Sequence, residues 1–399
     1  MAFRLENRVQ PYAWGSHTAI ARLQGRSTPS SAPEAELWMG AHPLAPSVLP
    51  DGERLDAFVR RDPGHALGAQ VQARFGDRLP FLLKVLAAET PLSLQAHPSE
   101  ARAQEGFARE EAAGIPRDAP HRNYKDPHHK PELLVALEPF AALCGFRAIP
   151  ELLALFTTIG VPEVVAPLAA RPDADGLAAT FRAVVADPRH VPAVLAGCAR
   201  HDGGPFAPGL RWAERIAALY PGDPGIVVSL LLEVLELAPG QGVFLPAGNL
   251  HAYLSGVGIE IMASSDNVLR GGLTPKHVDV PELLATLDFS APRTRPLSPP
   301  DARETVWDTR AGAREFLLSR VHVTPDTPFA TAVTGPEILL CTEGEARIRS
   351  GVPGATEPIR TVALPRGAAA FVPDSDGDYV LEGEASVFRA RVPLDDALS

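Results

Sequence analysis

The sequence predicts a mainly β-stranded protein with an inserted α-helical block. Short apolar segments bounded by glycine and proline dominate both ends of the chain, which is typical of strands and turns. Between them, the Ala- and Leu-rich residues 148–225 repeat their apolar positions at helical spacing. Proline makes up 41 of the 399 residues, about twice the usual share, which favours interrupted helices over one bundle of long helices.

The same patterns divide the chain into three parts. Residues 1–147 contain short strands, turns and a few short helices, and the strand pattern returns at about residue 230. After residue 300 the chain is almost entirely strand and turn. We therefore predict one β domain made of residues 1–147 and 226–285, a helical domain at 148–225, and a second β domain at 286–399.

The two predicted β domains share a short sequence echo. The segments GQGVFLP (240–246) and GAAAFVP (367–373) each place a glycine six residues before a proline, around an apolar run. A repeated turn and strand suggests two related β-barrels, although two seven-residue segments can also match by chance. In this alignment Asp378 stands where the first copy has His251, and no QxH sequence precedes it. We therefore expect no metal site of the first copy's kind in the second barrel.

Charge and composition exclude several classes of partner. A formal charge of −11 argues against nucleic acid or an anionic membrane as the main partner. The longest apolar runs have about seven residues, far fewer than the ~20 of a membrane span, and the first twelve residues lack the apolar core of a signal peptide. Three widely spaced cysteines offer no disulfide framework. We expect a soluble cytoplasmic protein.

Lysine is rare, and its positions mark three segments of the chain. Only four of the 37 basic residues are lysine, namely Lys84, Lys125, Lys130 and Lys276. Lysine is a compact charge whose pKa shifts on burial, so arginine does not replace it everywhere. Four residues can also cluster by chance. The functional interpretation points to residues 80–98, 121–137 and 240–277, which also contain the polar motifs described next.

Polar and apolar residues alternate in these segments as they do along a barrel strand. In PLSLQAHP (91–98), alternation puts Ser93, Gln95 and His97 on one face and the leucines on the other. The same period aligns two further polar sets, His128, Lys130 and Glu132, and Asn249, His251, Tyr253 and Ser255. A strand of this kind buries its apolar face and turns its polar face toward an enclosed cavity.

Two histidines, one glutamate and one glutamine from these strands could converge on one ion. Nitrogen and carboxylate ligands without thiolate suit zinc, and less well manganese or iron. Three strong ligands and a weak amide leave room for water or substrate, and a net charge of about +1 could polarise a carbonyl or hydroxyl. Each histidine could instead be an ordinary hydrogen-bonded structural residue, and Glu132 could form a salt bridge with Lys130.

The third segment, residues 258–279, adds charged groups. Glu260 alternates with isoleucines, so its carboxylate is expected in the same cavity. Asp266, Arg270 and Lys276 follow in a Gly- and Ser-rich stretch of the kind that often holds functional residues over a barrel mouth. A solvated loop with ordinary charges is the alternative.

Six motifs of the chain resemble those of the type I mannose-6-phosphate isomerases. They are QPYAWGS (10–16), AELWMGAHP (35–43), LPFLLKVLAAETPLSLQAHP (79–98), HHKPELLVAL (128–137), AGNLHAYL (247–254) and ASSDNVLRGGLTPKHVD (263–279). The last hundred residues match only in general character. The resemblance implies a zinc enzyme of the cupin superfamily, with a catalytic jelly roll, an inserted helical domain and a second jelly roll.

The resemblance also assigns residues to roles. One zinc ion per chain is expected, with the ligands Gln95, His97, Glu132 and His251. The essential arginine of the family corresponds to Arg270. The positions that line the substrate pocket correspond to Trp14, Glu36, Lys84, Ser93, Lys130, Tyr253, Glu260, Asp266 and Lys276.

The implied reaction interconverts D-mannose 6-phosphate and D-fructose 6-phosphate through a cis-enediol. Zinc and Arg270 would stabilise the developing enediolate oxygen. The candidates for the proton-transfer base are Glu260, Asp266 and Lys130. The candidates for phosphate binding are Lys84, Lys276 and Arg270. An iron-dependent cupin oxygenase and a non-catalytic sugar-binding cupin are the alternatives. We expect a small-molecule sugar phosphate as the partner, with no nucleic acid and no membrane, and a monomer.

Overall fold

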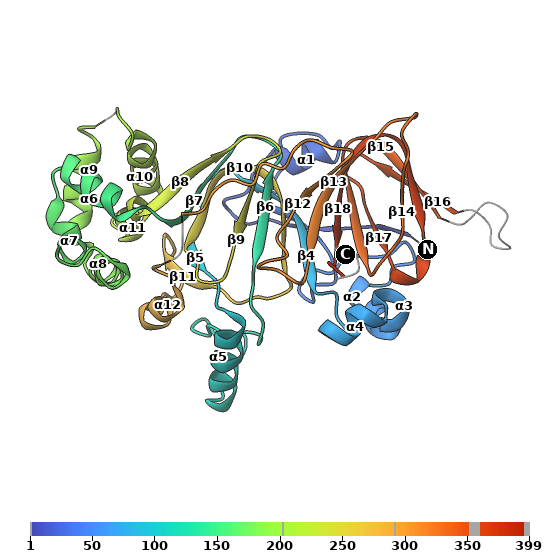
Figure 1. Cartoon of the computed structure of the whole chain (residues 1–399), viewed down its shortest axis with the longest axis horizontal. Helices are drawn as coiled ribbons and strands as arrows, with labels where there is room; N and C mark the ends of the chain where they lie inside the picture. Colours follow the sequence, from blue (N-terminus) through green and yellow to red (C-terminus); the bar gives the residue numbers. More distant parts are fainter. Residues whose placement is uncertain (1, 202, 291–292, 351–359, 395–399) are drawn as a thin grey trace.

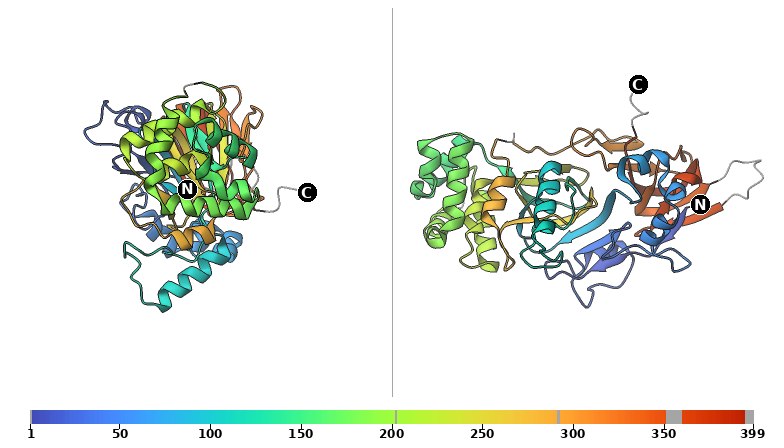
Figure 2. Two further views of the ribbon diagram at one scale, coloured as in Figure 1. Left: turned by 90° about the vertical axis from the view of Figure 1, so that its left-hand side faces the viewer. Right: turned by 90° about the horizontal axis from the view of Figure 1, so that it is seen from below.

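Two antiparallel sheets form the body of the protein, and a group of helices extends from one end (Figure 1). The computed structural model describes residues 2–201, 203–290, 293–350 and 360–394. Seen from below, the helical group and the smaller sheet lie at opposite ends of the long axis (Figure 2). Of the helices in these ranges, none has the length and apolar character that a membrane crossing requires. The predicted mainly β fold with a helical insertion is confirmed.

The larger sheet has ten strands and is organised around its longest one. Its strands are β2 (Arg8–Gln10), β3 (Glu36–Met39), β4 (Phe81–Ala88), β5 (Leu94–Ala96), β6 (Glu132–Ala136), β7 (Phe140–Phe146), β8 (Leu232–Leu237), β9 (Gly242–Leu245), β10 (His251–Ala263) and β11 (Leu269–Gly272). The first residues of β10 pair with β5 and β7, and its later residues pair with β4 and β6. Strand β10 therefore joins the pieces of sheet that carry the polar motifs.

A glycine lets β10 change partners in the middle of its length. Gly256 has a φ of +123°, and a Cβ at this position would lie only 2.7 Å from Cα of Phe140. A side chain would therefore push β7 away, and the conformation itself favours glycine. Gly383 has a φ of +124° in the corresponding strand of the other sheet.

The smaller sheet has eight strands, taken from both ends of the chain. They are β1 (Phe3–Leu5), β12 (Glu304–Trp307), β13 (Leu317–Val323), β14 (Phe329–Thr331), β15 (Glu337–Ser350), β16 (Arg360–Pro365), β17 (Ala369–Val372) and β18 (Tyr379–Arg391). Strand β1 joins this sheet by pairing with β17. The domain boundaries predicted from the sequence remain a proposal, and β1 crosses them.

The sequence echo corresponds to equivalent structures in the two sheets. Gly240 and Gly367 both adopt a positive φ, and each is followed two residues later by a four-residue strand, β9 or β17. The long strands β10 and β18 come next, each thirteen residues in length. Gly256 of β10 lies sixteen residues after Gly240, and Gly383 of β18 lies sixteen residues after Gly367. This correspondence supports two related barrels over a chance match.

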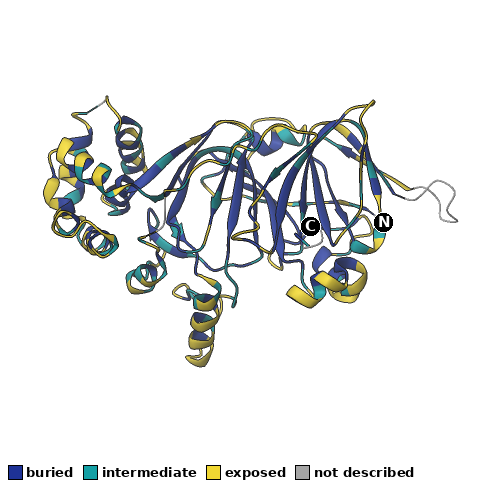
Figure 3. Cartoon of the chain, in the orientation of Figure 1, coloured by how far each residue is buried: buried dark blue, intermediate teal, exposed yellow. Residues whose placement is uncertain are grey.

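Helices cover the edges of the two sheets. Those before the insertion are α1 (Ala19–Leu23), α2 (Leu55–Arg61), α3 (Pro63–Leu67), α4 (Ala69–Phe75) and α5 (Glu100–Ala112). The insertion contains α6 (Ile149–Thr158), η1 (Pro162–Val165), α7 (Ala166–Ala170), α8 (Ala174–Ala186), η2 (Pro188–His190), α9 (Val191–Cys198), α10 (Ala207–Leu219) and α11 (Gly225–Leu231). The last are α12 (Val280–Thr286) and η3 (Asp374–Asp376). The outer faces of these helices are exposed, whereas the strands are mostly buried (Figure 3).

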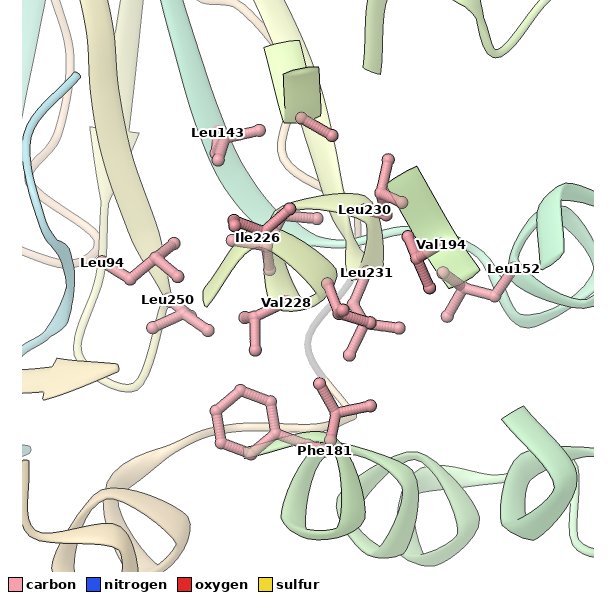
Figure 4. Close-up of a cluster of buried hydrophobic side chains, with 14 of the residues drawn as sticks. Leu94, Leu143, Leu152, Phe181, Val194, Ile226, Val228, Leu230, Leu231 and Leu250 are labelled. Atoms are coloured by element: carbon pink, nitrogen blue, oxygen red, sulfur yellow. The ribbon is translucent and has the colours of Figure 1, made fainter. Parts of the chain in front are cut away.

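The insertion shares a hydrophobic core with the larger sheet. Leu152, Phe181 and Val194 of the insertion belong to the same buried cluster as Leu143 and Leu250 of the barrel region (Figure 4). Helix α11 lies in this cluster with all seven of its residues buried. It begins at the predicted domain boundary, and the sequence pattern did not reveal it. A helix that is buried on every side has no polar face, so its apolar residues show no helical period.

A second core joins the two sheets. It contains Leu83 and Ile259 of the larger sheet together with Trp307, Ile338 and Phe388 of the smaller one. Because apolar side chains of both sheets fill one cluster, the barrels pack directly against each other.

The smaller barrel buries an ion pair among its apolar residues. Glu337 is fully buried and Arg389 is 4% exposed. Nε of Arg389 donates to Glu337 at 2.7 Å, and a second guanidinium nitrogen contacts the same carboxylate. Tyr379 also donates to it, at 2.8 Å. Burial raises the pKa of Tyr379, and the neighbouring Glu337 charge raises it further.

We expect Glu337→Gln to lower the free energy of unfolding by about 3–5 kcal/mol, because it leaves the buried Arg389 charge without its main partner. Denaturant unfolding would measure this, with Glu345→Gln on an exposed position of the same strand as the control. The double variant Glu337→Leu, Arg389→Met should lose less stability than the single variant. Equal stability of Glu337→Gln and the wild type would contradict the prediction.

Candidate active site

Three side chains at the start of different strands or just beyond them form a cluster that could hold a metal ion. Glu132 is the first residue of β6, His251 is the first residue of β10, and His97 directly follows β5. All three are buried, and one ligand atom of each lies within 4.8 Å of the others. Nε2 of His97 and Nε2 of His251 lie 3.3 and 3.4 Å from the two oxygens of Glu132.

The hydrogen bonds of the two histidines leave their Nε2 atoms available as ligands. Nδ1 of His97 lies 2.8 Å from the carbonyl oxygen of Asn267, and Nδ1 of His251 lies 3.2 Å from that of Asn249. A carbonyl only accepts, so Nδ1 carries a hydrogen in both rings, which leaves Nε2 as the nitrogen that can bind a metal ion. Both Nε2 atoms are buried without a hydrogen-bond partner in the described structure. This is the arrangement that a metal ion would complete.

Electrostatics keep His97 and Glu132 in the protonation states that bind metal. Burial lowers the pKa of His97 to about 4, so the ring is neutral at pH 7. Burial alone would raise the pKa of Glu132, but Lys130 and the two histidines lower it well below its usual range. Nζ of Lys130 lies 2.9 Å from the Glu132 carboxylate. The chain therefore presents a neutral His97 imidazole and an ionised Glu132 carboxylate.

Gln95, the predicted fourth ligand, lies beside this cluster on β5. Its register partners are His251 on one side and Arg270 on the other. Strand β5 is only three residues long, so the predicted alternation over 91–98 holds for its central part. The roles of Gln95 and the three clustered residues as ligands remain a prediction.

A second group of buried charges lies on the neighbouring strands. Lys84 of β4 and Glu260 of β10 are register partners, and Nζ of Lys84 lies 3.0 Å from the Glu260 carboxylate. The same ammonium lies 3.5 Å from Glu36. Tyr253 donates to Glu260 at 2.9 Å. Burial raises the pKa of Glu260, against the opposing effect of Lys84.

Asp266 lies in a loop that hydrogen bonds hold firmly. Its carboxylate lies 3.4 Å from Nε2 of His42. The next residue, Asn267, accepts from the main chain of Lys125 at 2.8 Å and donates to the carbonyl oxygens of Asp126 and His128. These bonds tie two loops together and place Asp266 and Lys125 at one cavity.

Three cations of the site, Lys125, Arg270 and Lys276, lie close enough to influence one another. Burial lowers the pKa of Lys276, and the nearby positive charges of Arg270 and Lys125 lower it further. Burial also lowers the pKa of Arg270. Among the residues that the structure describes, none of the three has a carboxylate partner within salt-bridge distance. An anionic group would relieve the repulsion between them.

One cavity of about 550 Å³ connects the carboxylates to the cations. Most of the predicted site residues line it, namely Trp14, Glu36, Lys84, Ser93, Gln95, Lys130, Glu132, Tyr253, Glu260, Asp266, Arg270 and Lys276. His97 and His251 do not line the cavity and are buried. His128, which alternation aligned with Glu132, instead faces a separate small cavity beside Arg78.

Among the other lining residues, sequence reasoning did not place Tyr12, His42, Lys125 and Tyr220 at the site. The scarcity of lysine did single out Lys125 and its segment. Tyr220 comes from the helical insertion, where no local pattern distinguishes it. Its position depends on how the insertion packs against the barrel.

A barrel cavity with a buried group of two histidines and one carboxylate defines a metal-binding protein of the double-barrel class. Comparisons with known proteins agree. The family model "Phosphomannose isomerase type I, catalytic domain" matches residues 2–149. Mannose-6-phosphate isomerase of Escherichia coli K12 is 38% identical over 397 residues, with 97% of this chain and 98% of that protein covered. The human protein of the same name is 32% identical over 410 residues, with 93% of this chain and 93% of that protein covered.

Solved structures give the same result. The Salmonella typhimurium mannose 6-phosphate isomerase with bound substrate and zinc has a TM-score of 0.89 to this chain and is 37% identical. The comparison covers 98% of this chain and 100% of that one. The protein belongs to the type I phosphomannose isomerase family, and the predicted resemblance is confirmed.

Proposed function

We propose that this chain is a zinc-dependent isomerase that interconverts D-mannose 6-phosphate and D-fructose 6-phosphate. The observation that carries the proposal is one cavity that is lined both by Glu132 of the buried ligand cluster and by three cations that lie close to one another. A sugar phosphate has a reacting carbonyl and a dianionic phosphate, so its chemistry matches both groups of residues.

His97, Glu132 and His251, with Gln95 beside them, would hold the zinc ion. Their donor set and protonation fit it, because the two free Nε2 atoms of the described structure and the carboxylate are oriented toward one another. When bound, zinc supplies a Lewis acid that polarises a carbonyl or hydroxyl oxygen.

Arg270 stabilises charge in the proposed reaction. Isomerisation removes a proton from the carbon next to the carbonyl, so negative charge develops on the enediolate oxygen. Arg270 is the register partner of Gln95 and lines the cavity, where its guanidinium can donate to that oxygen. Because its charge is fixed at every working pH, it acts without titrating.

Three side chains of the cavity remain candidates for the proton transfer between C1 and C2. Glu260 is held by Tyr253 and Lys84, which fixes its position. Asp266 is supported by His42, and Lys130 contacts the Glu132 carboxylate. Each group lines the cavity and can exchange a proton with substrate.

The phosphate group is assigned to Lys276 and the cations near it. Lys276 and Lys125 supply donors, and Arg270 adds positive charge near them. Lys84 is a weaker candidate than these, because Glu260 and Glu36 already neutralise its ammonium.

The decisive test combines metal analysis with an isomerase assay. Purified protein should contain close to one zinc per chain and interconvert the two sugar phosphates. A chelator should remove the activity and added zinc should restore it. Protein that carries zinc without converting mannose 6-phosphate would overturn the proposal.

The same preparation separates the two alternatives. An iron-dependent oxygenase would consume oxygen and regain activity with iron rather than zinc. A non-catalytic sugar-binding protein would bind mannose 6-phosphate without releasing fructose 6-phosphate.

We also propose that the enzyme acts as a monomer in the cytoplasm. Three large hydrophobic residues are exposed in the described structure, Tyr12, Leu44 and Leu219, and single residues of this kind do not make an interface. The cysteines Cys144, Cys198 and Cys341 are all free and buried, as is usual in a reducing compartment. Light scattering after gel filtration would test the monomer.

A further inference from the structure

The helical insertion contacts the cavity through one short turn. This turn, residues 220–224, joins α10 to α11, which begins at Gly225. Tyr220 lines the cavity, and its hydroxyl donates to the carbonyl oxygen of Pro91 at 3.1 Å, just before β5. Three residues later, Asp223 faces the segment that follows β11. The turn therefore contacts two segments beside the cavity, one before β5 and one after β11, and these lie next to each other because Leu94 pairs with Gly272.

The carboxylate of Asp223 joins the insertion to that segment. One oxygen accepts the main-chain N–H of Gly225 at 2.7 Å, at the start of α11. The other oxygen accepts the N–H of Leu273 at 2.9 Å and that of Thr274 at 3.4 Å. Hydrogen bonds to a charged acceptor are stronger than those between neutral groups. Asp223 therefore joins the start of α11 and the segment after β11 by accepting main-chain N–H groups from both.

The segment has a conformation that needs such support. Leu273 has a φ of +57°, the only positive φ of a non-glycine residue in the described structure. This left-handed conformation is unfavourable for a residue with a side chain. The Leu273 side chain is 1% exposed, which anchors it in the core shared with the insertion. Without the Asp223 carboxylate, the N–H of Leu273 would lose its acceptor.

The main chain of this segment also lies close to the main chain at the start of α11. Gly272 has a φ of +128°, and a Cβ on it would lie 3.0 Å from Cα of Gly225. Only two glycines allow the start of α11 and the segment to approach this closely. The approach brings the amides of Leu273 and Thr274 within reach of Asp223.

The segment that Asp223 holds continues to Lys276, one of the three neighbouring cations that line the cavity. Thr274, Pro275 and Lys276 all line the cavity. The hydroxyl of Thr274 accepts the main-chain N–H of Lys276 at 3.1 Å, so the position of Thr274 sets the position of the lysine. Arg270 is held separately, by pairing of β11 with β5.

We propose that Asp223 is a positioning residue, through which the helical insertion fixes the Leu273–Lys276 segment for binding of the substrate's phosphate. The inference rests on the proposed function, because that function assigns the substrate's phosphate to Lys276 and the cations near it. It gives the insertion a role in substrate affinity, and it leaves the metal ligands untouched.

The test compares Asp223→Ala with a matched control in the same insertion. Loss of hydrogen bonds to a charged group should raise KM for mannose 6-phosphate about tenfold or more, with kcat nearly unchanged and zinc content equal to wild type. Titration with inorganic phosphate should show a Kd raised by a similar factor. Asp223→Asn keeps the size of the side chain but only one acceptor oxygen, so it should shift both constants in the same direction.

Asp173→Ala provides the control. Asp173 also accepts two main-chain N–H groups, those of Asp175 and Gly176, but at the start of α8 and away from the cavity. It should lower thermal stability and leave KM and the phosphate Kd unchanged, which separates positioning from loss of stability in the insertion.

Two results would overturn the inference. One is a wild-type KM and phosphate Kd in both Asp223 variants, and the other is an equal rise of KM in Asp173→Ala. If the wild type binds inorganic phosphate but converts no mannose 6-phosphate, the proposed function fails, and the phosphate titration of the Asp223 variants still tests the positioning.

Discussion

His251→Ala is expected to lose zinc and isomerase activity together. His251 offers one of the two buried Nε2 atoms that have no hydrogen-bond partner in the described structure, and Glu132 faces it at 3.4 Å. Mutation of a residue that only hydrogen-bonds to a metal ligand typically lowers metal affinity about 10–100-fold. Loss of a ligand itself should therefore lower zinc affinity about 100-fold or more. Metal analysis after dialysis and the isomerase assay, with and without added zinc, would measure both losses.

Two further variants make the result specific to the cluster. Glu132→Gln nearly preserves shape while removing the single carboxylate, so it should lose zinc without a cavity in the core. His190→Ala removes a histidine of the helical insertion outside the cluster and should keep full zinc content and activity. Retention of zinc and turnover by His251→Ala would contradict the proposed ligand set.

Arg270→Ala is expected to lose turnover while its zinc content remains that of the wild type. The guanidinium lines the cavity but does not belong to the metal cluster. Removal of one donor to a developing oxyanion typically lowers kcat by about 10²–10³-fold. Steady-state kinetics with parallel metal analysis would measure the separation of the two effects.

The charge and the geometry of Arg270 can be tested apart. Arg270→Lys keeps a positive charge but loses the planar fork of donors, so it should recover only part of the activity. Arg215→Ala, on an exposed position of α10 outside this cavity, serves as the control and should behave as wild type. Wild-type turnover in Arg270→Ala would remove this residue from the mechanism.

Local sequence patterns predicted much of the fold because the elements differ in period. Alternation identified the polar faces that carry Gln95, Glu132 and Tyr253, and all three line one cavity. Helical spacing identified the insertion. Neither period identified α11, because all seven of its residues are buried and the sequence there is uniformly apolar.

Contacts between distant residues were beyond local patterns. The sequence offered Lys84 for phosphate binding, whereas the fold places its ammonium against Glu260 and Glu36. It grouped His128 with Glu132, yet His128 faces another cavity because β6 begins only at Glu132. The strand pairing of β1 with β17 joins the two ends of the chain, which no local pattern indicates.

The sequence by itself determined the class of fold and the family, and it supplied the candidate side chains for the chemistry, because periodicity and long motifs are properties of neighbouring residues. Only the tertiary structure decided which of them meet. The facing imidazole nitrogens, the three clustered cations and the reach of Asp223 to Leu273 arise where separate strands and an inserted helical turn pack together. Such proximity depends on the closure of the barrel and its shared core, which no segment of the chain encodes alone.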